Sequence, residues 1–212
     1  MHPISRPESG PPGCGQPANI MLNKIFGNLR TDFWGTWGCW QDRRPIWLLG
    51  GGAALFLEIF SWAFFQTYLG LWPCEMCVYI RFSMLVVFLG AMVAAIKPEN
   101  PVLKLSGYII VIWGLVRGII WDITLEMENL RAQDDTWISL CSPSSASYPF
   151  GLPLDTWLPS HFLPLAACGE DSNWSLLGLN MAEWLFPIYA LFSLGIILML
   201  IGWLVRLKRA RG

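Results

Sequence analysis

Residues 73–96 read PCEMCVYIRFSMLVVFLGAMVAAI, and this stretch decides the fold. It opens with two cysteines in a Cys-x-x-Cys spacing and continues as an apolar run. A helix needs roughly 20 such residues to cross a bilayer, and a segment inside lipid must be helical because unpaired backbone groups are not tolerated there. The stretch therefore predicts a membrane-spanning helix over about 78–96, with a pair of thiols at its entrance.

Three further stretches share this length and apolar character, at about 46–68, 105–125 and 184–205. The composition agrees with a membrane protein, since 54% of the 212 residues are apolar and 14% are charged, whereas soluble domains carry about 25% charged residues. The net charge of −1 disfavours a nucleic-acid binder, which would be clearly basic, and the hydrophobicity disfavours a disordered chain. We therefore predict an all-α membrane protein built as a bundle of four transmembrane helices.

Lysines and arginines gather on one side of this predicted bundle. Five precede the first span, two lie between the second and third, and four follow the fourth. Because positively charged loops stay cytoplasmic, both termini are predicted to be cytoplasmic, and loops at about 69–77 and 126–183 are predicted to face outward. No apolar run precedes the first span, which is expected to act as an uncleaved signal anchor. The predicted organisation is a cytoplasmic tail at 1–45, a four-helix domain at 46–207 and a basic tail at 208–212.

This orientation sorts the six cysteines by compartment. Disulfides persist in oxidising compartments, so the two cysteines of the cytoplasmic tail are expected to be reduced and inert. The other four are expected outside, as a close pair at the entrance of the second span and a distant pair in the long loop. The tail holds Cys14 and Cys39, the second span begins with Cys74 and Cys77, and the loop holds Cys141 and Cys168.

The close pair lies where a thiol is readily activated. Pro73, which precedes it, suits the first turn of a helix, and a helix N-terminus stabilises the negative charge of a thiolate. Arg81 follows Cys77 by four residues and so lies one turn deeper on the same face. An arginine at this depth is costly in lipid and usually marks a functional site, although it can also reach to the interface or pair with a structural carboxylate. We select Cys74, Cys77 and Arg81 as candidate site residues.

Other charges fall within the predicted spans. Glu58, in the first span, and Arg117, in the third, are equally compatible with a structural pairing that holds the bundle together and with a functional role. Asp122 and Glu126 lie near the outer end of the third span and are expected at the membrane interface.

The distant pair lies in a proline-rich loop. Cys141 and Cys168 are 27 residues apart, and a disulfide between them is expected to be exposed, where it either exchanges with other thiols or staples the loop. The apolar segment Leu152–Leu163 predicts a short amphipathic helix on the membrane surface, which would hold the cysteines near the membrane. A four-cysteine zinc site is disfavoured, because such sites usually show two close pairs and only His161 is available outside.

Together these features resemble the disulfide bond formation protein B family (DsbB), the quinone-dependent oxidases of periplasmic thiols in the bacterial inner membrane. The resemblance covers roughly Ile46–Leu207, and the order of the two cysteine pairs is also that of the family. It rests on the segments LE at 57–58, FQ at 65–66, PCEMCVYIR at 73–81, VIW at 111–113, RG at 117–118, LPLDTWLP at 152–159 and WSLLGLNMAEWL at 174–185.

Two departures point to a branch of the family. The tail before the first span is longer than in most members, and the outer end of the third span, around Leu125, lacks the histidine that the best-known members have near the quinone. Both features are similar to the DsbI-type branch, which serves a dedicated periplasmic partner. The missing histidine affects the quinone contacts and leaves the thiol chemistry intact.

The resemblance implies a path for electrons. A periplasmic thioredoxin-fold dithiol protein of the DsbA/DsbL type would attack the loop disulfide at Cys141, and Cys168 would relay to Cys74. Cys77 would then be released as a thiolate facing a quinone, either ubiquinone or menaquinone, with Arg81 stabilising the developing charge. The implied protein is a multi-pass protein-disulfide oxidoreductase of the bacterial inner membrane, in contact with lipid and without a metal or a nucleic-acid partner.

Two other classes stay open. A vitamin K epoxide reductase-like enzyme is also a quinone-linked four-helix bundle, but its Cys-x-x-Cys follows the loop pair, whereas here it precedes that pair. A non-catalytic membrane scaffold could use the same disulfides only to brace its loops. The sequence also leaves open which loop cysteine pairs with Cys74 at rest.

Overall fold

The computed structural model describes residues 38, 40–132, 138–139, 141, 145–168 and 175–211, with side chains as far as 208. The chain forms two compact units, of which the first comprises 1–42 and 198–212 and the second 43–197. In the described part of the first unit, Arg206 forms an ion pair with Asp42. The second unit holds the two pairs of cysteines discussed below.

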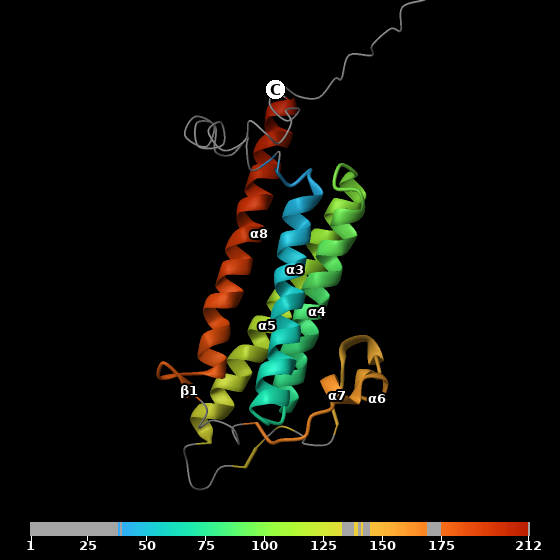
Figure 1. The fold of residues 1–212 in the computed structure, drawn as a ribbon. Helices are drawn as coiled ribbons and strands as arrows, with labels where there is room; N and C mark the ends of the chain where they lie inside the picture. The colour runs from blue at the N-terminus through green and yellow to red at the C-terminus, as the bar shows by residue number, and fades with distance from the viewer. Residues whose placement is uncertain are drawn as a thin grey trace, which may run out of the picture. The chain divides into compact units, whose positions relative to one another are not determined.

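The described residues contain four helices long and apolar enough to cross a membrane, which confirms the predicted fold class (Figure 1). The end of the bundle at which α4 begins and α5 ends is called the cysteine end below. The spanning helices are α3, Arg44–Phe60, which continues as the π-helix η2, Ser61–Tyr68; α4, Glu75–Ile96; α5, Pro101–Arg131; and α8, Met181–Arg211. A two-stranded hairpin, β1, Ser175–Leu176, and β2, Leu179–Asn180, precedes α8.

Side-chain caps set where two of the long helices begin. At the start of α5, the Asn100 side chain accepts a hydrogen bond from the Val102 N–H at 2.9 Å. At the start of α8, the Asn180 side chain accepts from the Glu183 N–H, and the Glu183 carboxylate accepts from the Asn180 N–H. This reciprocal pair is a capping box, which satisfies two backbone donors that the helix itself leaves unpaired.

Two helices extend beyond the predicted spans. α5 continues to Arg131 and α8 begins at Met181, so Glu126 and Glu128 lie on a helix and not in the loop. Arg131 pairs with Glu128 at 2.9 Å within the last turns of α5. A hydropathy pattern ends where the lipid ends, whereas a helix continues as long as its backbone and side-chain pairs support it.

α4 and α5 pack at backbone distance through small residues. A Cβ added to Gly107 would lie 2.6 Å from the Ala94 Cβ and 2.8 Å from the Gly90 carbonyl oxygen. A Cβ added to Gly114 would lie 3.1 Å from the Val87 side chain. Small residues let membrane helices approach closely, because lipid supplies no hydrophobic force between them. This contact forms the core of the second unit.

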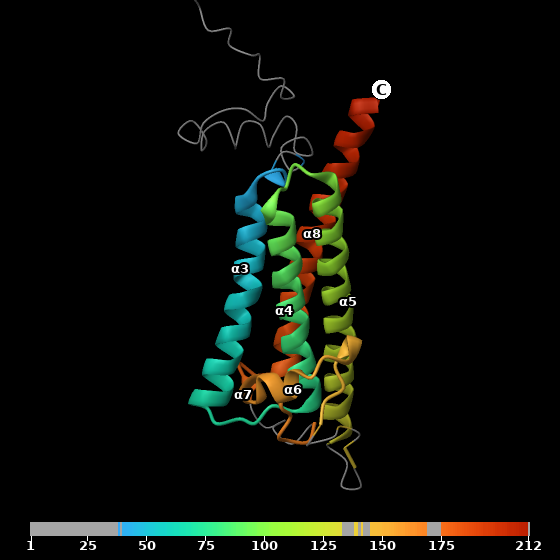
Figure 2. The same cartoon turned by 90° about the vertical axis from the view of Figure 1, so that its right-hand side faces the viewer.

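The loop between α5 and α8 differs from the single helix predicted over 152–163. It contains the 3-10 turn η3, Pro149–Gly151, and two four-residue helices, α6, Leu154–Trp157, and α7, Pro159–Phe162. Pro159 separates α6 from α7, because a proline disfavours the helical conformation in the residue before it. Figure 2 shows α6 and α7 beside the beginning of α4, at the cysteine end.

Candidate active site at the cysteine end

Cys74 and Cys77 begin α4, as the sequence predicted. Cys74 is the N-cap, and its sulfur accepts a hydrogen bond from the Cys77 N–H at 3.2 Å. Pro73 therefore precedes the cap and does not occupy the first turn, which corrects the prediction. Both cysteines are free thiols, and Cys74 is buried while Cys77 is partly buried. The pair lies at the positive end of the α4 dipole, where a thiolate is stabilised.

Cys141 and Cys168 form the loop disulfide, with their Cα atoms 5.7 Å apart. The Ser139 hydroxyl donates to the Cys168 carbonyl at 3.4 Å and accepts from the Cys141 N–H at 3.3 Å. Cys141 is 6% exposed and Cys168 has no exposed surface. The expectation of an exposed disulfide is therefore wrong, because the loop folds onto the cysteine end and covers it.

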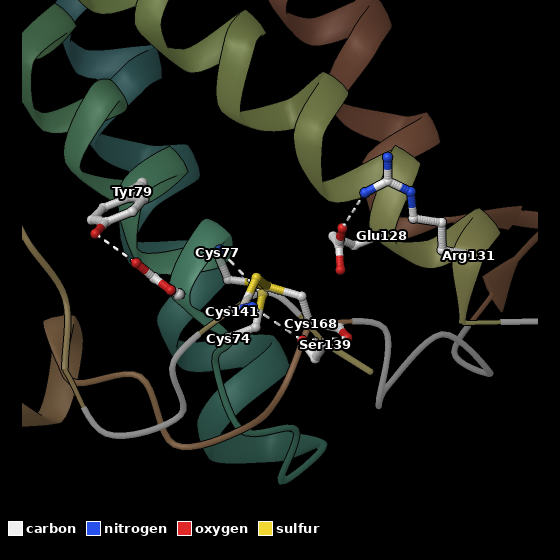
Figure 3. Close-up of a disulfide and its surroundings, with 9 residues drawn as sticks. Cys74, Cys77, Tyr79, Glu128, Arg131, Ser139, Cys141 and Cys168 are labelled. Carbon is white, nitrogen blue, oxygen red and sulfur yellow. Dashed lines mark hydrogen bonds and ion pairs between the residues drawn. A yellow bond between two sulfur atoms is a disulfide. The ribbon is translucent and has the colours of Figure 1, made fainter. Parts of the chain in front are cut away.

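The segment that leads to Cys168 runs beside the thiol pair. The N–H groups of Leu165 and Ala166 both donate to the Pro73 carbonyl, at 2.9 and 3.3 Å. Cys74 and Ala166 form a parallel β-bridge. Cys168 follows Ala166 by two residues, so this bridge brings the chain at Cys168 close to the thiol pair. Figure 3 shows the loop disulfide next to the two thiols, so the structure brings together all four cysteines that the sequence selected.

Further hydrogen bonds fasten the preceding part of the loop. The Tyr79 hydroxyl, on α4, donates to the Glu75 carboxylate and accepts from the Ser147 N–H, each at 2.8 Å. The Tyr148 hydroxyl donates to the Phe162 carbonyl at 2.6 Å, and its ring meets that of Tyr79 edge to face at 5.4 Å. These contacts hold the loop against α4, where the disulfide is buried.

Arg81 is 4% exposed and is held by two distant parts of the chain. Its Nη1 donates to the Gln66 side-chain oxygen at 2.8 Å and to the His161 carbonyl at 3.1 Å. Gln66 in turn donates to the Ser160 carbonyl at 2.9 Å, so η2, α4 and α7 meet here. Within the described part, the buried Arg81 Nε finds no acceptor. Arg81 is thus oriented by an amide and a carbonyl, and it keeps a donor for a further ligand.

Gln66 and His161 were not selected for this site from the sequence. The signal for Gln66 was the FQ segment of the family resemblance, and His161 was weighed only as a metal ligand. Gln66 lies in the π-helix η2, and π-helical turns frequently mark functional sites. The His161 ring stacks on Trp62 at 4.7 Å. Burial, and then the Arg81 charge, lower the pKa of His161 below its usual 6.5, so its ring is neutral at neutral pH.

The two thiols hold their protons differently. The side-chain hydrogen bond to Cys77, followed by burial, raises the pKa of the Cys74 thiol well above its usual value. Cys74 therefore keeps its proton and can donate it in a hydrogen bond to the Cys77 sulfur.

The buried charges take positions that the sequence left open. Glu58 is 6% exposed, and neither of its carboxylate oxygens has a hydrogen-bond partner among the described residues. Arg117 does not pair with it, and its guanidinium lies 4.7 Å from the centre of the Trp121 ring, a cation–π contact. Asp122, expected at the interface, has no exposed surface.

The described residues include no group of three or more histidine, cysteine or acidic side chains that could hold a metal ion. Cys14 and Cys39, predicted to be inert, lie outside the part of the chain that the structure describes.

Comparison with known proteins agrees with this arrangement of cysteines. A family model described as disulfide bond formation protein DsbB matches residues 43–200. The chain belongs to the DsbB family. Two relatives that bear the name DsbI come from Shewanella oneidensis and Campylobacter fetus subsp. fetus. The first is 35% identical over 197 residues (87% of this chain and 92% of the relative), and the second is 36% identical over 215 residues (88% and 100%).

A third relative, from Escherichia coli O1:K1 / APEC, is named protein-disulfide oxidoreductase DsbI and is 35% identical over 176 residues (79% of this chain and 78% of the relative). These relatives confirm both the family resemblance and the DsbI-type branch. With its four spanning helices, this member of the DsbB family is a multi-pass membrane disulfide oxidoreductase.

Proposed function

We propose that this DsbB-family protein accepts electrons from a periplasmic thioredoxin-fold dithiol protein of the DsbA/DsbL type and passes them to a membrane quinone. The observation that carries the proposal is the β-bridge between Cys74 and Ala166, which sets the loop disulfide beside the thiol pair. Two adjacent redox pairs allow a thiol relay within one chain. The proposed setting is the bacterial inner membrane, with both termini in the cytoplasm and the loop in the periplasm, where disulfides persist.

The proposed relay moves two electrons through successive disulfide exchanges. A partner thiolate attacks the Cys141 sulfur, the Cys141–Cys168 bond breaks, and Cys168 leaves as a thiolate. Cys168 then attacks Cys74 in a Cys74–Cys77 disulfide and releases Cys77 as a thiolate. The second partner thiol frees Cys141, which attacks Cys168, restores the loop disulfide and releases Cys74, which takes a proton. The state described here, with a loop disulfide and two free thiols, corresponds to the end of this sequence.

The residues around Arg81 fit a quinone, which would accept two electrons and two protons when bound. Arg81 is buried, is oriented by Gln66 and the His161 carbonyl, and keeps an Nε–H without an acceptor in the described part of the chain. The stacked rings of Trp62 and His161 add a flat surface nearby. We assign Arg81 to bind a quinone oxygen and to stabilise negative charge on it, and Cys77, one turn nearer the cysteine end, to supply the electrons.

A quinone also suits the redox potential of the proposed partner. A DsbA-type protein has a reduction potential of about −120 mV and is itself a strong oxidant. Its reoxidation therefore needs a stronger electron acceptor, and a quinone is soluble in the lipid that surrounds this bundle.

Turnover with purified components tests the proposal. The protein in detergent is mixed with a reduced DsbA-type partner and a soluble quinone, and the quinone absorbance is followed. We expect the wild type and the control Cys39→Ser to reduce the quinone, and Cys77→Ser and Cys141→Ser to fail. Full turnover by Cys77→Ser would contradict the proposed electron path, and partner oxidation that continues without quinone would contradict the cofactor.

A further inference from the structure

The hairpin before α8 has at its tip a leucine whose backbone conformation is unusual for this residue type. The pairing of β1 with β2 leaves Leu177 and Gly178 at the tip. Their φ angles are 56° and 81°, a combination that favours an asparagine or a glycine at the first position, because a Cβ is crowded when φ is positive. The hairpin itself therefore gains nothing from a leucine here, and the role of this side chain lies outside the hairpin.

The side chains at this tip are apolar and exposed. Leu177 is 85% exposed, and its neighbours Leu176 and Leu179 are 52% and 38% exposed. No charged residue stands between Asp171 and Glu183 in the sequence. A cluster of exposed apolar side chains in an uncharged segment is typical of a surface that contacts another protein or a membrane.

A second tip of the same kind lies in η3. Among the described residues, Phe150 and Leu177 are the two non-glycine residues with positive φ, and each is followed by a glycine that also has positive φ. Phe150 is 84% exposed, and the centre of its ring lies 5.6 Å from that of Trp113. Trp113 belongs to the part of α5 that the sequence predicts to lie in the bilayer, so the Phe150 tip lies against a membrane-spanning surface.

Hydrogen bonds hold the hairpin against two of the spanning helices. The Trp184 indole N–H, in the first turn of α8, donates to the Leu176 carbonyl, and the Asn180 side-chain amide donates to the Glu126 carboxylate of α5, each at 3.1 Å. Tryptophans near the ends of spanning helices lie at the level of the lipid headgroups, so the hairpin is held at that level. Figure 1 shows the hairpin pointing away from α4 and α5.

The exposed surface of α8 is apolar as well, and it continues from the hairpin. Phe186 and Leu191 are exposed on α8, and such side chains on a spanning helix face lipid. We propose that the hairpin tip, residues 176–179, inserts into the lipid interface beside α8 and anchors to the membrane the end of the loop that follows Cys168. Insertion removes the apolar surface of Leu177 from water and so offsets the conformational cost of its positive φ. The proposal does not depend on the electron path.

Photo-crosslinking to lipid tests the anchor in the wild-type protein. The full-length protein is placed in vesicles of phosphatidylethanolamine and phosphatidylglycerol that include a phospholipid with a diazirine near the start of its acyl chain. After irradiation, mass spectrometry maps the labelled residues. We expect label on the hairpin tip and on Leu191, which serves as the internal reference. Label on α8 without label on the tip overturns the proposal and leaves the tip available to a protein partner.

Leu177→Asn tests the side chain itself, because asparagine adopts positive φ readily and keeps the hairpin turn. It should lower the labelling of the tip roughly tenfold relative to Leu191, as expected when one leucine side chain no longer partitions into lipid. Label on Leu191 shows that the variant is folded and inserted. Phe150→Asn makes a matched change at the other tip and should leave the labelling of the hairpin unaltered. Equal labelling of the hairpin in Leu177→Asn and the wild type overturns the proposal.

Discussion

At Arg81, a single side chain joins three segments of the chain. Nη1 bridges the Gln66 side chain and the His161 carbonyl, and Nε has no acceptor in the described part. Lysine keeps the charge, but its compact ammonium lacks the planar fork that lets Nη1 make both contacts while Nε points elsewhere toward a ligand. Arg81→Lys should therefore raise the quinone KM roughly tenfold, equivalent to about 1.4 kcal/mol, with a smaller change in kcat. Steady-state quinone reduction measures both constants, with the exposed Arg131→Lys as control, and an unchanged KM would remove Arg81 from the quinone site.

His161 should give the stability of the fold a pH dependence. Its pKa in the folded protein is lowered from 6.5 by burial and by Arg81, so the unfolded chain binds this proton more tightly. This group should leave the free energy of unfolding unchanged well above pH 6.5 and should reduce it as the pH falls below that value. Urea unfolding in detergent across this range, compared with His161→Asn, measures the effect. If the free energy of unfolding changes with pH in the same way in the two proteins, His161 is not shielded from water.

Spacing along the chain was sufficient to place Cys74 and Cys77 at the start of a helix and Arg81 one turn deeper, because a helix N-terminus and an interval of four residues are local features. The contact of His161 with Arg81 and the burial of Asp122 were not predicted, for the opposite reason. His161 meets Arg81 across 80 residues of sequence, and the contact depends on how the loop returns to the bundle. Asp122 was expected at the interface because hydropathy reports depth in a membrane, whereas the packing of neighbouring helices decides whether a side chain is buried.

Among the elements, the part of the loop around Ser147 is fastened to α4 by Tyr79. Tyr79 joins the Ser147 N–H to the Glu75 carboxylate. In the proposed relay a partner must reach Cys141, which is 6% exposed, so the loop has to open. Tyr79→Phe removes about 1 kcal/mol of hydrogen bonding, which should increase the open fraction roughly fivefold. Reduction of the loop disulfide by dithiothreitol measures this, with the exposed Tyr68→Phe as control, and an unaltered rate would show that the loop opens without breaking these bonds.

The contact between α4 and α5 depends on Gly107. An added Cβ would lie 2.8 Å from the Gly90 carbonyl oxygen, and backbone cannot move aside as a flexible side chain can. Gly107→Ala should therefore lower the free energy of unfolding by about 1–3 kcal/mol. Gly195→Ala in α8 is the matched control, because an added Cβ there meets nothing within 4 Å, and it should be neutral or slightly stabilising. Equal unfolding curves in denaturant for the two variants would mean that α4 and α5 are not closely packed.

Hydropathy found all four spanning helices, but it could not find their internal irregularities. An apolar run has the same composition in an α-helix and in a π-helix, so η2 left no sign in the sequence, although it presents Gln66 to Arg81. Pro159 indicates the break between α6 and α7, but the apolar character of 152–163 favoured a single helix. The observed helix ends also differ from the predicted ends of the spans. A cap such as Asn180 satisfies backbone groups at the end of a helix, and its position does not depend on where the lipid ends.

For the molecule as a whole, the close packing of helices and the cluster of polar side chains lie in different regions. Along the middle of the second unit, glycines bring α4 and α5 together, and the polar groups gather at the cysteine end, where η2, α7 and the loop meet α4. This arrangement keeps the loop disulfide beside the thiol pair, with the disulfide and Cys74 buried and Cys77 partly buried. The same end is the one that the charge pattern predicts to face outward, so orientation in the membrane decides whether the relay can meet a partner.

Of the fourteen lysines and arginines, eleven lie on the side predicted to be cytoplasmic. We therefore expect both termini inside and the loop outside, since the positive-inside rule sets orientation and the loop disulfide needs an oxidising compartment. A phosphatase that requires disulfides should be inactive when fused after Gly212 and active when inserted near Glu170. A galactosidase that folds only in the cytoplasm should be active when fused after Gly212 and inactive when inserted near Glu170. An active phosphatase at the C-terminus would invert the topology, place the loop disulfide in a reducing compartment and contradict the proposed partner.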